Sequence, residues 1–403
     1  MNTASSAAAG TRPAPAAHAA ARSTAAEPGL PWRVQRIASL NDFLARWQQL
    51  ATPAPTPFHS AAWLRHWYAT LGRQPGLEPL LLCARREGDS ADAMLMPLVR
   101  RRQGRLAIVE PPDHGVSDYN GPLLNPSLTF DERFDASCAA PLWQALKQAL
   151  AGNDLLRIDK LLTHVGGQPN PLALALPCQP CNMFGNHFSI AGTYDEWRHS
   201  LAKDVRKEFE RTWRVFSRIE GARFVHATEP AQALALYRQL EAMQHARMAG
   251  TPGYRLDDAA HSQLYAGLLQ DGLHDGLQSG QVVLTALMQG DQAIAALYGL
   301  LEGGTYTMLR VSFAGDAWKH CAPGKLILER TIAHLHEQGC RQFDFAIGDY
   351  AHKRIFKTTP RPLLDACVAL SWRGLPAVAA WRARHLLRRH SALVALARRL
   401  RRR

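Results

Sequence analysis

The chain has 403 residues, of which 47% are hydrophobic, and it carries a formal net charge of +13. This length is enough for two domains with a large core, and no apolar run approaches the roughly 20 residues that a membrane-spanning helix needs. Ten arginines and no acidic residue fall within residues 366–403, so the rest of the chain carries only +3, which argues against a nucleic-acid-binding body.

The N-terminal part is predicted to be a disordered leader followed by a first folded half. Residues 1–30 are mostly Ala, Thr, Ser and Pro and lack the apolar core of a secretory signal. The first half, residues 31–175, begins with a strand, an aromatic helix and a strand pair around a polar turn. The expected bounds of its early elements are 32–40, 59–71, 80–83, 93–99 and 106–109.

A loop in the first half contains a candidate catalytic residue. Residues 111–126 are rich in Pro, Gly and Asp, which predicts irregular structure before a helix at 139–150 and a strand at 154–160. Asp118 lies in this loop. A carboxylate there can face a cleft, or it can accept hydrogen bonds from its own backbone as turn residues do. Both interpretations of Asp118 stay open.

The second half, residues 176–374, is expected after a boundary in the proline-rich segment 168–180. Its predicted elements are a long charged helix at 195–218, a strand at 223–227, helices at 230–249 and 257–276, strands at 282–288, 292–301 and 305–313, a helix that ends at 339, and strands at 342–347 and 366–372. This order predicts an α/β (α+β) fold of two tandem halves, each a mixed, mostly antiparallel sheet flanked by helices.

The turn before the helix that ends at residue 339 is a candidate phosphate site. It contains Ala322-Pro323-Gly324-Lys325 directly before the helix. Free amides at a helix start point one way and the helix dipole adds to their attraction for an anion, while Gly324 lets a ligand approach the backbone. In the next strand Asp344 lies among apolar residues, so it needs a partner or a catalytic task.

The C-terminal segment 375–403 is rich in arginine. Residues 377–400 can form a helix with leucines on one side and most arginines on the other, although Arg382 and Arg389 fall on the leucine side, and such a helix with Trp381 near its start suits an anionic membrane surface. Docking of this helix on the body is an equal alternative, and nucleic acid is a weaker one. Seven scattered cysteines fit a reducing compartment. The C-x-x-C of Cys178 and Cys181 lacks the second pair of a usual zinc site, so we expect no metal.

Several short motifs together resemble the GNAT acyltransferase superfamily. They are Ala322-Pro323-Gly324-Lys325-Leu326, Phe343-Asp344-Phe345, Gly348-Asp349-Tyr350 with Lys353, the basic run 203–211, and Ser117-Asp118-Tyr119. Within the superfamily the pattern looks closest to acetyltransferases associated with cellulose and exopolysaccharide biosynthesis, and more distantly to Fem-type peptidoglycan aminoacyl transferases. The resemblance covers about residues 35–372.

The resemblance implies acetyl-CoA or another acyl-CoA as co-substrate. Lys319, Ala322 and Gly324 take the three marked positions of the superfamily's pyrophosphate turn, with Ala322 standing where that turn has a glycine. The residues that would contact the donor are Val311, Phe313, Lys319, Ala322, Pro323, Gly324, Lys325 and Leu326.

The resemblance also suggests catalytic and acceptor-binding residues. Tyr350 would be the acid that protonates the leaving group, with Asp118 and Asp344 as further catalytic candidates; a half-buried loop tyrosine and a structural aspartate are the alternatives. Arg206, Arg247, Asp349 and Lys353 would contact the acceptor. The residues of this set that lie on charged helices can equally form surface ion pairs.

The sequence therefore predicts a cytoplasmic acyltransferase, with peripheral contact to the inner membrane through the arginine-rich tail as an option. The acceptor is expected to be an amine or hydroxyl of a small molecule or saccharide, and no nucleic acid is expected as a partner. Two alternatives stay open. One is a Fem-like aminoacyl transferase that uses charged tRNA, and the other is a catalytically degenerate, membrane-associated partner of an exopolysaccharide machine.

Overall fold

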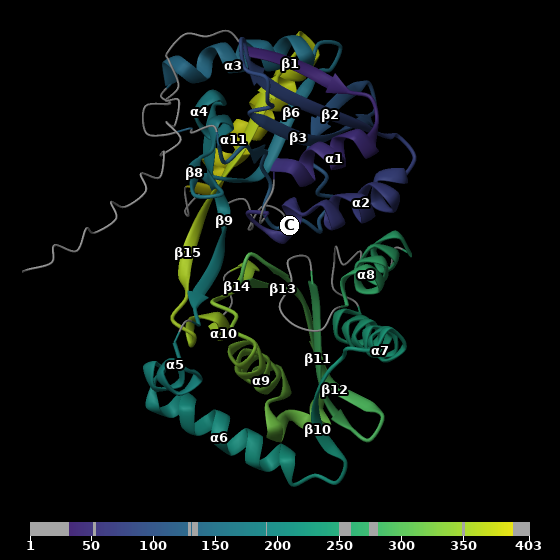
Figure 1. The fold of residues 1–403 in the computed structure, drawn as a ribbon, viewed down its shortest axis with the longest axis vertical. Coiled ribbons are helices and arrows are strands. Elements are labelled where there is room, and N and C mark those ends of the chain that lie inside the picture. Colours follow the sequence, from purple (N-terminus) through teal and green to yellow (C-terminus); the bar gives the residue numbers. More distant parts are fainter. Residues whose placement is uncertain are drawn as a thin grey trace, which may run out of the picture.

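A computed structural model describes residues 32–50, 54–127, 130, 136–190, 192–249, 259–273, 281–348 and 351–389. One 13-stranded sheet runs through the whole molecule in the order β1-β2-β3-β4-β6-β15-β9-β14-β13-β12-β11-β10, with β5 paired to β3. Helices cover this sheet in an upper and a lower half (Figure 1). The expected α/β fold of two tandem, mostly antiparallel halves is therefore confirmed.

The first half supplies the upper part of the sheet. Its strands and helices are β1 Trp32–Ile37, α1 Leu40–Leu50, α2 Ala61–Ala69, β2 Leu77–Arg86, β3 Met94–Gln103, β4 Leu106–Glu110, β5 Leu123–Leu124, α3 Ala136–Ala149, β6 Leu155–Leu162, β7 His164–Val165, β8 Gln168–Pro169 and α4 Pro171–Ala175. Strands β7 and β8 form a separate two-stranded sheet, and short 3-10 turns occupy Pro57–His59 and Leu71–Arg73. Ser60 caps α2 by accepting a hydrogen bond from the Trp63 amide, which explains why the aromatic helix starts where it does.

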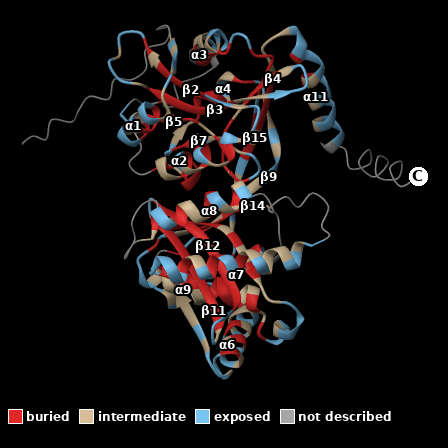
Figure 2. Ribbon diagram, turned by 90° about the vertical axis from the view of Figure 1, so that its right-hand side faces the viewer, coloured by how far each residue is buried: buried red, intermediate tan, exposed pale blue. Residues whose placement is uncertain are grey.

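The second half supplies the lower part. Its elements are β9 Cys178–Ser189, α5 Tyr194–Ser200, α6 Lys203–Ser217, β10 Ala222–His226, α7 Pro230–Met248, α8 Ala259–Gly272, β11 Gln281–Gln289, β12 Gln292–Glu302, β13 Thr305–Phe313, α9 Pro323–Glu337, β14 Gln342–Ile347, α10 Ala351–Arg354 and β15 Thr359–Ala369, with a 3-10 turn at Asp316–Cys321. A 3-10 turn at Trp372–Gly374 and α11 Leu375–Arg389 follow, and α11 packs on the upper half. Buried residues concentrate along its central strands (Figure 2).

Two long strands join the halves. β9 pairs with β14 of the second half on one side and with β15 on the other. β15 comes near the end of the described chain, yet its residues from Leu363 to Ala369 pair with β6 of the first half. The sequence placed a last strand at 366–372 in the second half, so this exchange was not predicted. The two halves share one hydrogen-bonded sheet and cannot be separated by a single cut in the chain.

The helices pack as the apolar spacing of the sequence requires. α9 buries Leu326, Ile327 and Ile332 in a core between α5, α6 and one face of the second half's sheet. α7 and α8 cover the other face, and α8 also meets α2 of the first half, where the rings of Trp63 and Tyr265 lie 6.3 Å apart edge to face. The core under α7 and α8 is continuous with that of the first half.

The expected helix at 195–218 is in fact two helices. α5 ends at Ser200 and α6 begins at Lys203, with Leu201 buried between them in extended backbone. A capping box of Thr193 and Glu196 starts α5. The break lets α5 and α6 pack against α9 at different angles, as Figure 1 shows, which one continuous helix could not do. The expected boundary loop at 168–180 also contains α4 and the start of β9.

Candidate functional site

The second half's sheet splits between β13 and β14. These strands run parallel and pair only from Thr305 to Thr307, opposite Gln342 to Asp344. Beyond Thr307, β13 continues to Phe313 along β12 alone, while β14 follows β9. A V-shaped opening, called here the second V, therefore lies between the end of β13 and the end of β14. Backbone groups along its edges have no partner strand in the described part of the chain.

A cavity of about 350 Å³ opens beside the second V, at the start of α9. Seven of the eight predicted donor-binding residues line it, which are Val311, Phe313, Lys319, Ala322, Pro323, Gly324 and Lys325, and Glu208, Arg247 and Leu328 complete the wall. Leu326, the eighth, is fully buried in the core below. The turn that the sequence singled out therefore borders this cavity.

Fewer amides at the start of α9 are available to a ligand than the resemblance implies. Pro323 has no N–H. The amides of Lys325 and Leu326 both donate to the carbonyl of Ala322, at 3.0 Å each. In the described chain only the amide of Gly324 among these has no acceptor, so it is left for a ligand. A methyl group on Gly324 would lie 2.7 Å from the Phe313 ring, so only glycine allows this ring to pack on the turn.

Positive charge surrounds the same cavity. Arg247 stacks over the Phe313 ring at 5.0 Å and donates a hydrogen bond of 3.1 Å to the carbonyl of Val311, an edge group of the second V. Arg247, predicted to contact the acceptor, thus lines the same cavity as the residues predicted to contact the donor. Lys319 forms an exposed ion pair with Asp316 at 2.9 Å, and Lys325 contacts Glu208 at 2.8 Å. Exposed pairs of this kind exchange readily for a phosphate ligand.

Asp344 lies at the root of the second V and is fully engaged. Its carboxylate accepts hydrogen bonds from the Tyr119 hydroxyl (2.8 Å) and the Ala346 amide (2.7 Å), and it pairs with Arg361 at 3.1 Å. Burial raises the pKa of Asp344, although Arg361 and the Tyr119 hydroxyl oppose that shift. These contacts match the structural interpretation of this aspartate, and its catalytic role stays a prediction. Through Tyr119, Asp344 fastens the two halves together.

Asp118, next to Tyr119, is the freer of the two carboxylates. Within the described ranges no group donates a hydrogen bond to it. Burial raises its pKa to about 6, since the positive charges of Lys160 and Lys353 only partly offset that effect. Asp344 adds to the rise, which places both carboxylates in one electrostatic neighbourhood although they come from different halves. A carboxylate with a pKa near 6 can act as a general base close to neutral pH.

Loop 111–122, which carries Asp118, closes a corresponding opening in the first half. β4 and β6 pair in parallel only at Ile108 with Leu155 and Val109 with Leu156, and the opening beyond them is called here the first V. Asn120 fills it: its amide donates to the Lys160 carbonyl, and its carbonyl accepts from the Leu162 amide, both at 2.9 Å.

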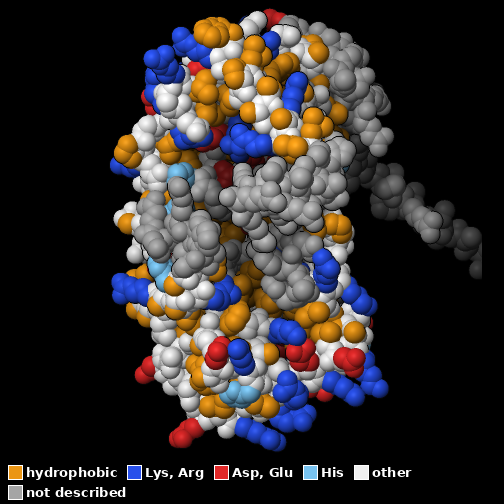
Figure 3. Space-filling view, turned by 180° about the vertical axis from the view of Figure 1, so that it is seen from behind, with side chains coloured by type: hydrophobic (Ala, Val, Ile, Leu, Met, Phe, Trp, Pro, Cys, Tyr) orange, Lys and Arg blue, Asp and Glu red, His pale blue; other side chains and the backbone are white. Residues whose placement is uncertain are grey.

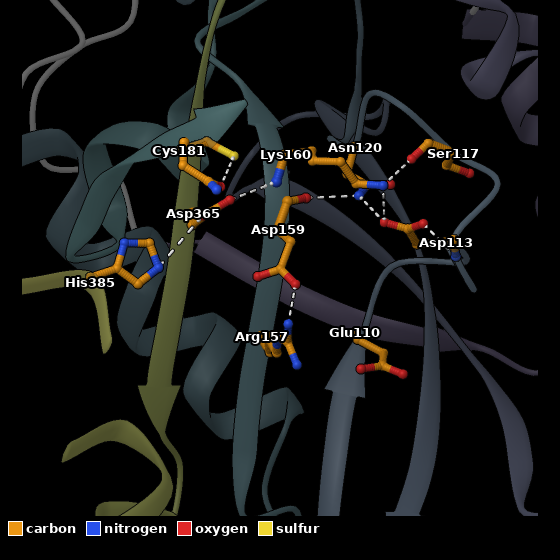
Figure 4. Close-up of polar contacts among 12 residues, drawn as sticks. Glu110, Asp113, Ser117, Asn120, Arg157, Asp159, Lys160, Cys181, Asp365 and His385 are labelled. Atoms are coloured by element: carbon orange, nitrogen blue, oxygen red, sulfur yellow. Dashed lines mark hydrogen bonds and ion pairs between the residues drawn. The ribbon is translucent and has the colours of Figure 1, made fainter. Parts of the chain in front are cut away.

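Side chains hold this loop in place. The side-chain amide of Asn120 donates to the Asp159 carbonyl at 2.7 Å and to the Asp113 carboxylate at 2.9 Å. The Lys160 ammonium group contacts Asp113 at 2.7 Å and donates to the Ser117 carbonyl (Figure 4). The first V is therefore sealed by the protein's own chain, and the sealing loop carries Asp118 within electrostatic range of Asp344 and Lys353, which lie on or next to β14. Seen from behind, the surface is hollowed between the halves (Figure 3).

The remaining candidates lie in different places. Lys353 is buried and donates to the carbonyls of Phe345 (2.9 Å) and Ile347 (2.8 Å), so it holds the end of β14. Arg206 lies on α6 and does not line the cavity beside the second V. Asp349 and Tyr350 fall outside the described residues.

Burial raises the pKa values of Cys178 and Cys181 to about 11 and 12. Among the described residues no cluster could hold a metal ion, and no helix is long and apolar enough to cross a bilayer.

Sequence reasoning missed three partners at this site. Tyr119 was noted only as part of a motif, and Glu208 only as an interruption in a basic run. Arg361 was not considered. A buried aspartate in an apolar strand signals that a cation lies near it, but the sequence does not say which one. Gly185 in β9 also indicates close packing at this site, because a methyl group there would lie 2.3 Å from the Tyr119 oxygen.

Comparison with known proteins agrees with this geometry. Residues 203–354 match the family described as Acetyltransferase (GNAT) domain, so this part of the second half is similar to domains of that class. The match begins with α6 and ends with α10, and it includes both strands of the second V and the turn at Gly324. It covers less than half of the chain. No curated protein matches.

Solved structures resemble nearly the whole chain. FemX is similar with a TM-score of 0.54 at 10% identity, over 83% of this chain and 96% of its own. The C-terminal domain of a putative lysylphosphatidylglycerol synthetase from Agrobacterium fabrum has a TM-score of 0.48 at 12% identity, over 85% and 96%. A tandem GNAT protein from the clavulanic acid biosynthesis pathway has a TM-score of 0.43 at 11% identity, over 84% and 99%. At these identities the likeness to FemX establishes the shared fold, and nothing more is drawn from it.

Proposed function

We propose that this protein transfers an acyl group from a CoA thioester to an amine or hydroxyl acceptor. The donor would lie in the cavity at the start of α9, with its thioester in the second V, and the acceptor would enter between the halves. The observation that carries this proposal is the separation of β13 from β14 after Thr307, directly beside that cavity. The match of residues 203–354 to a GNAT acetyltransferase domain supports it.

The residues at the cavity suit a diphosphate. The Gly324 amide stands at a helix N-terminus, where the helix dipole attracts anions. Arg247 offers a planar guanidinium group, and the ammonium groups of Lys319 and Lys325 complete a ring of positive charge. The apolar walls, Val311, Phe313 and Leu328, suit the aliphatic arm that joins a diphosphate to a thioester. Both parts of an acyl-CoA thus find matching surfaces.

A CoA thioester supplies an activated carbonyl and a stable thiolate leaving group. The task of the protein is then to deprotonate and orient the acceptor. Asp118 takes the proton from the acceptor nitrogen or oxygen as that atom forms its bond to the carbonyl carbon, and the carbon–sulfur bond breaks. The electron pair leaves on sulfur, which later takes a proton from solvent. Direct transfer of this kind needs no covalent enzyme intermediate.

Calorimetric titration of the full chain with CoA tests the proposal. We expect binding that Gly324→Leu weakens at least about tenfold, because the new side chain pushes the Phe313 ring into the cavity. Lys319→Ala should weaken binding several-fold, since it removes one charge from the ring. Lys207→Ala is the matched control, since this lysine is exposed on α6 and does not line the cavity. Absence of CoA binding by the folded protein would reject the proposal.

The Fem-like alternative keeps the fold but changes the donor to an aminoacyl-tRNA. The likeness to FemX is a likeness of fold, and the low charge of the body gives tRNA little to bind. Calorimetric titration with charged tRNA, run beside the CoA titration, separates the two functions: tRNA binding without CoA binding would favour the alternative. Binding of neither ligand would favour the non-catalytic partner of a polysaccharide machine. The polysaccharide-related acceptor itself is a proposal that rests on the sequence resemblance.

A further inference from the structure

Exposed large hydrophobic side chains gather at one place on the molecule. Among the described residues there are six, and four of them belong to the 3-10 turn Trp372–Gly374 and helix α11. These are Trp372 (76% exposed), Leu375 (59%), Leu386 (59%) and Leu387 (46%). Single exposed leucines are ordinary on proteins, but a cluster on one short segment indicates a contact surface.

The packing of α11 fixes which side points outward. Val378 is buried with Ile108, Leu155 and Cys367 of the first half's sheet, and Trp381 packs against the same group. Leu375 and Leu386 are eleven residues apart, about three helical turns, so they project from one common side. Because Leu375 and Leu386 are exposed and Val378 is not, this strip of the helix faces solvent, and it carries Leu375, Ala379, Arg382 and Leu386, so that one arginine lies between the two leucines. Figure 2 shows α11 at the edge of the upper half with most of its surface exposed.

The exposed charged side chains of this segment all have one sign. Arg373, Arg382 and Arg384 are exposed beside the leucines, and Arg373 lies over the Trp372 ring at 5.6 Å. No acidic residue occurs anywhere in residues 366–403, and seven further arginines follow Arg384 in the sequence. A surface that is apolar and cationic together matches an anionic lipid bilayer, whose headgroups attract arginine while its interface takes up leucine and tryptophan.

We propose that the face formed by Trp372, Leu375, Leu386 and the arginines around them docks the protein onto an anionic membrane surface. The bilayer is the occupant because a second copy would bring two strongly positive faces together. A nucleic acid would use the arginines but would leave the leucines in water. Since α11 packs on β15, which passes between the halves, docking would hold the whole sheet next to the membrane.

Sedimentation of the full chain with vesicles tests the proposal. We expect binding to phosphatidylcholine vesicles only when they contain phosphatidylglycerol, and weaker binding as salt rises. The triple change Trp372→Ser, Leu375→Ser and Leu386→Ser should lower the partition constant at least about tenfold, because these apolar side chains no longer enter the interface. Arg382→Gln should lower it roughly fivefold.

Matched controls distinguish binding through this face from non-specific binding through other exposed leucines and arginines. Leu174→Ser changes a leucine that is 44% exposed on α4, and Arg218→Gln removes an exposed arginine after α6, so neither should alter vesicle binding. Equal binding by the triple variant would overturn the proposal, as would binding that ignores phosphatidylglycerol. Self-association that the triple change abolishes would assign the face to a second copy. Duplex DNA binding that survives the triple change, without vesicle binding, would assign the arginines to nucleic acid.

Discussion

The two halves contain corresponding V-shaped openings, of which the first is closed and the second is open. In the first V, Asn120 pairs with β6 and the space is closed by the protein's own loop. In the second V, no described segment pairs with β13 on the side of β14, and a cavity lies next to it. Backbone groups at a split in a sheet must be satisfied by chain, water or ligand. The comparison teaches that the same split in a sheet can be closed by a loop of the chain or can be left open beside a cavity.

The second strand of each V shows how similar the halves remain. Lys160 in β6 and Ala346 in β14 both have a φ of +56°, in the left-handed region. In each case an aspartate from the sheet accepts the amide: Asp365 that of Lys160 at 2.9 Å, and Asp344 that of Ala346 at 2.7 Å. The local bend is the same, so the difference between open and closed arises from loop 111–122 and not from the strands.

The largest effect should come from breaking the fastening between the two openings. Asp344→Ala removes the acceptor of the Tyr119 hydroxyl and of the Ala346 amide and leaves Arg361 without its partner. We expect a loss of about 3 to 5 kcal/mol in the free energy of unfolding, measured by urea titration. Asp291→Ala, at an exposed aspartate 3.9 Å from Arg223, is the control and should leave that free energy unchanged. An unaffected Asp344→Ala variant would show that the halves are fastened elsewhere.

The second prediction tests whether the sealing loop serves the open site. Asp118→Asn should lower kcat about 100-fold or more, because the acceptor loses its base. For the wild type, kcat/KM should rise tenfold per pH unit and level off above about 6, the pKa of Asp118 in the folded protein. The variant should lose this dependence, whereas Asp195→Asn on exposed α5 should keep it. A variant with unchanged kcat would limit Asp118 to a role in the loop.

A smaller effect should follow from opening the first V. Asn120→Ala removes two side-chain hydrogen bonds, to Asp113 and to the Asp159 carbonyl. We expect a loss of about 2 kcal/mol in stability and faster hydrogen exchange of the Leu162 amide, which pairs with the Asn120 carbonyl. CoA binding in the second V should persist. The exposed Asn182 offers a control substitution, Asn182→Ala. If CoA binding disappears with Asn120→Ala, the two openings are coupled.

The smallest predicted effect is a gain in stability on replacing Asp118. Burial raises the folded-state pKa of Asp118 to about 6, well above its value in an unfolded chain, so its ionised form weakens the fold above pH 6. Below pH 4 the group is protonated in both states and this cost vanishes. After allowance for its partial exposure, Asp118→Asn should therefore stabilise the protein by about 1 kcal/mol at pH 7. The gain should close as pH falls toward 4, which thermal melts across that range would detect.

Local signals in the sequence were enough for the strand–turn–helix around Gly324. Alternating apolar residues predicted β13 and β14 at the bounds that the structure has, and the proline, the glycine and the stop at Gly339 predicted α9, which ends two residues earlier, at Glu337. Each of these signals acts over a few residues, so a single sequence displays it. The sequence pointed to this cavity because half of its lining residues come from that one turn.

Contacts between distant residues could not be predicted in the same way. Tyr119 and Asp344 are 225 positions apart, and nothing in either segment specifies the other. The route of β15 into the first half depends on which strand edge is left unpaired after every other strand has paired. For the same reason the closing of the first V by Asn120 was not foreseen, although its loop had been recognised as irregular.

The exchanged strand has a consequence for how the protein forms. β15 is made after every other strand of the sheet, yet β6 has no neighbour on that side until β15 arrives. While the ribosome is still extending the chain, the upper half therefore carries an exposed edge that invites pairing with other proteins. Its folding can be completed only after almost all of the lower half has emerged. A nascent chain stalled before Thr359 should consequently need a chaperone that a finished chain does not.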